Sequence, residues 1–298
     1  MKFKKLHFAM LVMGTLMPLG LGGCNDAEEV MNPEVPAGNA PVSVYVNDFT
    51  ISMGGFPGTR AAVDPSNYAD VRAITLAFYD GTDEVYKSTQ MKSETIGFGQ
   101  FSLSLPIGSY TMVVLGYDFY TGDALLLTSP TAAEYTSDHV RETFSYTEEV
   151  TIASSAAVSL SATLNRIVSE LRIVSTDNKS ANASTVRTTF SAGGKAFNPT
   201  TGLATANTGF SNTVGASLKV GAPTTSYNDI FLTSDEQTVD ITIDVLDVEG
   251  NSISQHSVQD VPLKRNRVTT LRGSLYSSGA SASFTLETSW LPETEILF

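Results

Sequence analysis

Alternation of apolar and polar residues with a period of two is the feature that most constrains the fold of this chain. It is clear over residues 42–47 and recurs over 72–79, 101–105 and 239–245. Because successive side chains of a β-strand point to opposite faces, this pattern predicts strands with one buried face. The run 110–117 is more continuously apolar, which indicates a strand buried on both faces.

The order of these strands predicts an all-β protein. Gly, Asp, Asn and Pro turns separate the short strands, and no convincing amphipathic helix interrupts them, which is typical of β-sandwiches. A run of small residues at Ser155–Ala162 precedes a second set of strands, of which Leu164–Val174 is predicted to be one. We therefore expect two sandwich domains in tandem, 42–158 and 159–298, and long loops in the Gly- and Ser-rich stretch 178–225.

The first 41 residues are predicted to lie outside this fold. Residues 1–23 have a lysine-rich start and an apolar run that is too short to span a membrane, as in a signal peptide. This leader ends in Leu-Gly-Gly before Cys24, the only cysteine, and resembles a bacterial lipobox. We expect a lipid on Cys24 and an outer-membrane lipoprotein, with 24–41 as an acidic, Pro-containing tether. The alternative is an ordinary signal peptide followed by an incidental cysteine.

Composition argues against several functions. The formal net charge of −13 lacks the basic footprint that nucleic-acid binding requires. One cysteine and three histidines leave little material for a metal site, and no catalytic motif is present. We expect no enzymatic activity, no cofactor and no bound metal. Asp247, Glu249 and Asn251 have the spacing that begins a calcium loop, but a hairpin turn explains them better.

One aromatic segment could bind a partner. Tyr117, Phe119 and Tyr120 come at the end of the predicted buried strand. Their rings could lie at a loop tip beside two carboxylates, Asp118 and Asp123. Exposed aromatic rings with acidic neighbours can stack on sugars or contact a peptide. The alternative is that these rings fold back over the end of the sandwich.

Five stretches, taken in order, resemble the fimbrillin-like subunits of Bacteroidetes type V pili. They are the lipobox with Phe56-Pro57-Gly58-Thr59-Arg60-Ala61-Ala62, the strands 74–80 and 98–114, the segment 164–173, and 262–271 near the C-terminus. Each stretch is weakly specific alone. Together they cover most of the chain after the leader.

The resemblance implies a fold and a way of assembling. Members of that family are lipoproteins with two transthyretin-like sandwiches. A trypsin-like protease cuts after an Arg and removes the first strand, and the exposed groove accepts a strand from the next subunit. Carried onto this sequence, the cut lies between Arg60 and Ala61, and the removed strand lies within 42–60. The family also contains tip subunits and anchors, and anchors are not cut.

The C-terminus offers a candidate donor strand for such a groove. Its apolar residues are Phe284, Leu286, Trp290, Ile296, Leu297 and Phe298. The alternative is that this strand completes its own sandwich.

Two classes of function therefore remain open. The first is a structural or adhesive fimbrial subunit, whose partners are other fimbrial subunits and an unidentified surface ligand. The second is a glycan-binding surface lipoprotein, with an uncleaved fimbrial anchor as a further alternative. Polymerisation after protease treatment distinguishes a pilin from a glycan binder.

Overall fold

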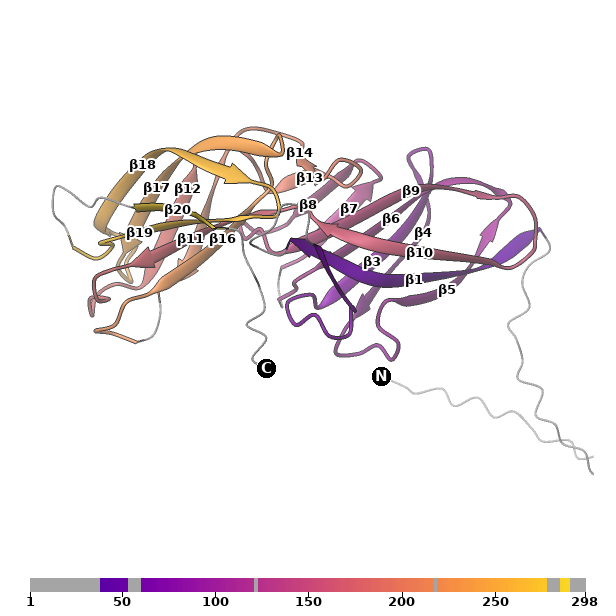
Figure 1. Ribbon diagram of the computed structural model, residues 1–298, viewed down its shortest axis with the longest axis horizontal. Coiled ribbons are helices and arrows are strands. Elements are labelled where there is room, and N and C mark those ends of the chain that lie inside the picture. The colour runs from indigo at the N-terminus through magenta and orange to yellow at the C-terminus, as the bar shows by residue number, and fades with distance from the viewer. Residues whose placement is uncertain (1–37, 53–59, 121–122, 217–218, 278–284, 290–298) are drawn as a thin grey trace, which may run out of the picture. The chain divides into compact units, whose positions relative to one another are not determined.

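The computed structural model describes residues 38–52, 60–120, 123–216, 219–277 and 285–289 (Figure 1). All regular structure in these ranges consists of β-strands. Accordingly, the described part of the chain has no helix long and apolar enough to cross a membrane. Cys24 and the rest of the predicted leader lie outside the described residues.

The first sandwich is built from one eight-stranded sheet. The order of its strands is β2-β1-β10-β9-β6-β3-β4. β5 pairs with the first half of β1, along the same edge that pairs with β2 further on. β9 and β10 share only two residue pairs, Asn165 with Ser145 and Arg166 with Phe144. The strands on either side of this narrow junction contribute to one core. The eight strands are β1 Asn39–Ser52, β2 Arg60–Val63, β3 Ala73–Asp80, β4 Asp83–Met91, β5 Gln100–Pro106, β6 Gly108–Tyr117, β9 Thr143–Ile152 and β10 Val158–Arg166.

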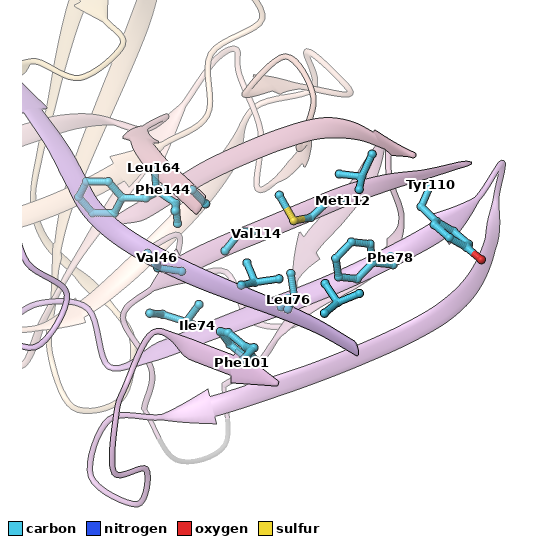
Figure 2. Close-up of a cluster of buried hydrophobic side chains, with 14 of the residues drawn as sticks. Val46, Ile74, Leu76, Phe78, Phe101, Tyr110, Met112, Val114, Phe144 and Leu164 are labelled. Atoms are coloured by element: carbon cyan, nitrogen blue, oxygen red, sulfur yellow. The ribbon is translucent and has the colours of Figure 1, made fainter. Parts of the chain in front are cut away.

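The alternating residues predicted from the sequence form this core. Figure 2 shows Val46 of β1 above Ile74 and Leu76 of β3, with Val114 of β6 in the same cluster. In β1 the buried apolar side chains are the even-numbered ones up to Val46, and then Phe49. A register shift between Val46 and Asp48 causes this change of phase, because one extra residue in a strand moves the following side chains to the other face.

A small third sheet covers the outer face of β3 and β6. Its order is β14-β13-β8-β7, formed by β7 Leu125–Ser129, β8 Ala132–Tyr135, β13 Ala196–Asn198 and β14 Leu203–Ala204. The alternate residues of β3 and β6 pack with this sheet in a second core. The expected burial of 110–117 on both faces is thus confirmed. The alternation over 72–79 had predicted one buried face, but both faces are buried because Ala73, Ala77 and Tyr79 suit the second core.

The second sandwich consists of two four-stranded sheets. Their orders are β16-β11-β19-β20 and β15-β12-β17-β18. Ile241 and Ile243 of β17 lie in its core with Leu171 of β11 and Leu271 of β19, as the alternation over 239–245 predicted. The strands are β11 Ser169–Ser175, β12 Thr185–Phe190, β15 Phe210–Gly215, β16 Thr225–Ile230, β17 Glu236–Leu246, β18 Ser252–Lys264, β19 Val268–Gly273 and β20 Thr285–Ser289.

Two expectations about the middle of the chain need correction. The strand predicted over 164–174 is two strands, since β10 ends at Arg166 and β11 begins at Ser169. β10 belongs to the first sheet, where it runs parallel to β1, so the chain changes sheets later than residue 159. Of the small-residue run, residues 155–157 lie in the turn between β9 and β10, and the rest forms the first half of β10. The stretch 178–225 contains four strands, β12, β13, β14 and β15, where long loops were expected. In β12 the residues that alternate into the core include Thr188 as well as Val186 and Phe190, so its polar composition does not mark the strand.

Candidate functional site

The strand that the resemblance marks for removal is held on both of its edges. β1 pairs in parallel with β10 along one edge and antiparallel with β5 and β2 along the other (Figure 1). Five of its apolar side chains are buried, Ala40, Val42, Val44, Val46 and Phe49, and so is the polar Thr50. Removing β1 would therefore uncover apolar surface and two rows of backbone hydrogen-bonding groups.

Phe49 is the largest buried side chain of β1, and it occupies a tight aromatic socket. Its ring centroid lies 4.8 Å from that of Phe144 and 5.7 Å from that of Tyr68. Gly116 of β6 forms the floor. A Cβ atom at this glycine would lie 2.6 Å from Phe49 Cε1 and 3.3 Å from Leu164 Cδ2. The close approach of the ring therefore requires glycine at position 116.

A charged network lies behind this socket. The Tyr68 hydroxyl donates a hydrogen bond of 2.6 Å to Glu142 Oε1, and Arg166 Nη2 donates one of 2.6 Å to the Tyr68 hydroxyl. Arg166 also pairs with Glu142, and its guanidinium lies 5.4 Å from the Phe144 ring centroid. Because partly buried charges are stable only when paired, this network fixes Tyr68 and Phe144 around Phe49.

Arg60 is the first residue of β2 and pairs with Ser52 of β1. β2 is the outermost strand of its sheet, so its backbone is bonded to β1 alone. Residues 53–59, which join the two strands, lie outside the described residues. A cut between Arg60 and Ala61 would break the covalent link from β1 to the rest of the fold. The sequence pattern puts three competing arginines, Arg72, Arg172 and Arg272, inside strands. Arg172 and Arg272 do lie in strands that are paired on both edges. Arg72 instead precedes β3, although its backbone N–H and carbonyl are bonded to Tyr117 and Lys92.

Of the candidate donor segment, the structure describes β20. It pairs antiparallel with β19, with Leu286 opposite Leu271, at the edge of its own sheet. This is the alternative considered from the sequence, in which the strand completes its own sandwich. The other candidate donor residues, Phe284, Trp290, Ile296, Leu297 and Phe298, lie outside the described residues.

Asp177 holds the segment that leads into β20. Its Oδ1 accepts a 2.7 Å hydrogen bond from the Leu275 N–H, and its Oδ2 accepts bonds of 2.9 Å from the Tyr276 and Ser277 N–H groups and of 2.8 Å from the Ser277 hydroxyl. Partial burial alone would raise the pKa of Asp177. These hydrogen bonds favour the carboxylate and outweigh burial, so the pKa lies below its usual value.

The predicted partner-binding loop is divided between core and surface. Tyr117 is buried, with its hydroxyl 3.2 Å from Thr75 Oγ1, and Phe119 packs against the same core. Tyr120 is exposed, and the guanidinium groups of Arg72 and Arg141 lie over its ring, 4.5 and 4.2 Å from the centroid. Two of the three rings thus fold back onto the sandwich, and Tyr120 faces solvent.

Tyr120 belongs to the wall of a cavity of about 420 Å³, hereafter the arginine hollow. Its wall combines residues of both sandwiches. The wall includes Asp118, Tyr120, Arg141, Arg172, Asn212 and Tyr227. Sequence reasoning found Tyr120 and its loop but missed the others, because they come from separate strands and loops and share no local motif.

The residues considered for metal binding have other roles. Asp247 accepts hydrogen bonds from the Asn251 N–H and side-chain amide in the turn between β17 and β18, which confirms the hairpin interpretation. His256 is buried, with Nε2 3.0 Å from the Leu275 carbonyl. Burial, with the nearby Arg141 charge, lowers the pKa of His139. Within the described ranges, no three His, Cys, Asp or Glu residues are grouped to hold a metal.

Comparison with known proteins places the chain in a family. Residues 42–296 match a family described as a family of unknown function, DUF6562. The chain belongs to this family. No curated protein matches it.

Solved structures share its all-β fold. A protein from Bacteroides ovatus described as a putative adhesin is 11% identical, with a TM-score of 0.52 over 86% of this chain and 97% of that one. The fimbrial anchor protein Mfa2 from Porphyromonas gingivalis is 11% identical, with a TM-score of 0.47 over 79% of this chain and 91% of that one. A structure from Bacteroides thetaiotaomicron described as putative polysaccharide binding proteins is 10% identical, with a TM-score of 0.46. The match covers 84% of this chain and 98% of that one. The predicted all-β class is confirmed, and the fold is shared with the protein described as a putative adhesin.

Proposed function

We propose that this protein is a structural or adhesive subunit of a cell-surface fimbria. It is exported as a lipoprotein through Cys24 and assembles by strand exchange after proteolytic removal of its first strand. The fold shared with the Bacteroides ovatus protein described as a putative adhesin supports the adhesive class. The lipobox in the leader supports export to the outer membrane and the cell surface.

One observation carries the assembly step. β1 is a central strand of the first sandwich, yet its covalent link to the following strands runs through the segment that ends at Arg60, on the outermost strand of the sheet. A single cut after Arg60 leaves β1 held by noncovalent contacts alone. An unpaired strand edge is a template for another chain's strand, and strand addition is a known mode of recognition.

The free energy contributed by the buried side chains of β1 indicates whether the cut alone would release this strand. Fully burying Val42, Val44, Val46 and Phe49 contributes roughly 6 to 12 kcal/mol at about 1.5–3 kcal/mol per side chain. This is of the same order as the whole stability of a typical domain, about 5–15 kcal/mol. We therefore expect the cut protein to keep β1 bound until an incoming strand replaces it.

The proposed incoming strand is the C-terminal segment of a neighbouring subunit. β20 is bonded on one edge to β19 at the border of its sheet, and the sequence after it ends in Ile296, Leu297 and Phe298. Their burial in a vacated groove would contribute roughly 1.5–3 kcal/mol each.

Polymerisation tests the proposal. The full chain is treated with trypsin under native conditions and run on an SDS gel without boiling. We expect ladders of stable polymers from the parent protein, and folded monomers without ladders from a variant that lacks Glu293–Phe298. A variant that still polymerises removes the C-terminus from the mechanism, and one that unfolds supports its role within its own sandwich. A parent protein that stays monomeric contradicts strand exchange and favours the uncleaved anchor or the glycan binder.

A further inference from the structure

The arginine hollow has a balanced charge in an acidic protein. Five carboxylates and four of the chain's nine arginines line its wall. Several pair within the wall, such as Arg172 with Glu170 at 2.9 Å and Arg166 with Glu142. Its volume of about 420 Å³ falls within the range of small-molecule sites, about 300–1,000 Å³. Balanced, paired charges disfavour a strongly charged ligand.

The wall also presents polar atoms that have no partner among the described residues. Asp118 Oδ1 accepts a hydrogen bond from the Phe119 N–H and pairs with Arg72, whereas no described residue bonds to Asp118 Oδ2. The side-chain oxygen of Asn212, a residue that is 2% exposed, is unsatisfied within the described structure. A buried acceptor without a donor costs about 1–3 kcal/mol, so a ligand that donates hydrogen bonds here is favoured.

Hydrogen-bond donors stand beside these acceptors. Arg141 bonds to Asp123 through Nε, and its terminal nitrogens bond to no described residue. Arg172 uses Nε and Nη2 on Glu170 and leaves Nη1 without a partner in the described part of the chain. The wall therefore offers unpaired acceptors and unpaired donors together. A hydroxyl group both donates and accepts, so a molecule rich in hydroxyls matches both sets.

One ring of the wall is available for stacking. Tyr227 projects from β16, the outermost strand of its sheet, and is 59% exposed, with the Arg172 guanidinium 5.2 Å from its centroid. The Arg72 and Arg141 guanidinium groups already lie over the Tyr120 ring, so this ring is less available for stacking. The tyrosine ring has an apolar face and a polar hydroxyl at its edge. It can therefore stack on the C–H face of a ring whose edge carries hydroxyl groups.

We propose that the arginine hollow binds a neutral carbohydrate, with one sugar ring stacked on Tyr227 and its hydroxyls bonded to Asp118, Arg141, Arg172 and Asn212. None of its residues lies on β1, β2 or β20, so cleavage and strand exchange remove none of them. Arg166 and Glu142 of its wall also belong to the network behind Phe49. It would supply an adhesive contact within the folded subunit.

Titration of the full chain with defined sugars tests the site. The probes are lactose, cellobiose, mannobiose and N,N′-diacetylchitobiose, with sialyllactose and a mixed-charge hexapeptide for comparison, followed by saturation-transfer NMR and calorimetry. We expect at least one neutral disaccharide to bind with a millimolar or lower Kd. Tyr227→Ala should weaken it about tenfold, and Asp118→Asn, which replaces an acceptor with a donor, at least fivefold.

Tyr45→Ala is the matched control, because Tyr45 is also an exposed strand tyrosine (42%) but lies on β1, outside the hollow. It should leave binding unchanged, and thermal unfolding confirms that each variant folds. If Tyr227→Ala fails to fold, Asp118→Asn decides. The proposal is overturned if no neutral sugar binds at 10 mM, if sialyllactose or the peptide binds in preference, or if both hollow variants bind as the parent does.

Discussion

Substitution of the glycine beneath Phe49 tests how tightly the first strand is held. In Gly116→Ala, the new Cβ would lie 2.6 Å from Phe49 Cε1 and 3.1 Å from Cζ, and the neighbouring rings of Tyr68 and Phe144 leave Phe49 little room to move. Overpacking of a core costs about 1–3 kcal/mol. Loss of glycine flexibility in the unfolded chain returns about 0.4–1 kcal/mol. We expect a net destabilisation of about 1–2 kcal/mol.

Thermal and denaturant unfolding measure this effect. For a chain of this size, a loss of about 1–2 kcal/mol lowers the Tm by roughly 2–8 °C. Gly215→Ala is the matched control, because Gly215 also lies in a strand but a Cβ there has no atom within 4 Å. It should be neutral or slightly stabilising.

A second substitution identifies Phe49 as the cause. Phe49→Leu removes ring atoms from the point of conflict, so it should cost less in the Gly116→Ala background than in the parent, with a coupling of about 1 kcal/mol. After cleavage at Arg60, Gly116→Ala should also speed the release of the β1 peptide. The reasoning is refuted if Gly116→Ala behaves like Gly215→Ala, or if Phe49→Leu costs the same in both backgrounds.

Three further predictions concern the leader, the cleavage point and the C-terminal segment. Cys24→Ala should abolish labelling by a palmitate analogue and release the protein or leave the precursor uncut, and unchanged labelling would refute lipidation. Limited trypsin digestion should cut after Arg60 before any other Arg or Lys, because β2 is outermost in its sheet and exposed loop ends are preferred sites; mass analysis that finds an earlier cut elsewhere counts against it. Asp177→Asn should destabilise the fold by about 1–3 kcal/mol, since hydrogen bonds to a charged group are lost. The pKa of Asp177 is lowered in the folded state. The difference in unfolding free energy between the variant and the parent should therefore be full above about pH 4 and disappear as the pH falls through the native pKa. A difference that stays constant down to pH 2 would contradict this role.

The positions of several strands can be predicted from the sequence, but which strands pair with one another cannot. Alternation located β17 and the core face of β3 because each buried side chain leaves a local mark. It could not reveal that β10 runs parallel to β1, since pairing depends on the register of strands distant in sequence. The register shift after Val46 likewise depends on the partner strand. In the sequence, the alternation of apolar and polar residues ends at this point without indicating how the strand continues.

The candidate sites also differ in whether the sequence could predict them: a site within one local motif was found, and sites formed by distant residues were missed. Arg60 was found from a short local motif, and the structure places it at the start of an outermost strand. The arginine hollow was not found, apart from Tyr120, because Tyr227 and Arg172 approach it from neighbouring strands of the second sandwich. The Phe49 socket was also missed, since the need for glycine at 116 arises only from a ring on another strand.

The N-terminal residue of the protein in polymers recovered from cells tests the central claim most directly. SDS-stable polymers are isolated from the cell surface, and their subunits are analysed by N-terminal sequencing and mass spectrometry. Removal of the first strand predicts that subunits within the polymer begin at Ala61 and lack the peptide that contains Val42 and Phe49. Polymer subunits that begin at a lipidated Cys24 and retain β1 would contradict assembly by strand exchange.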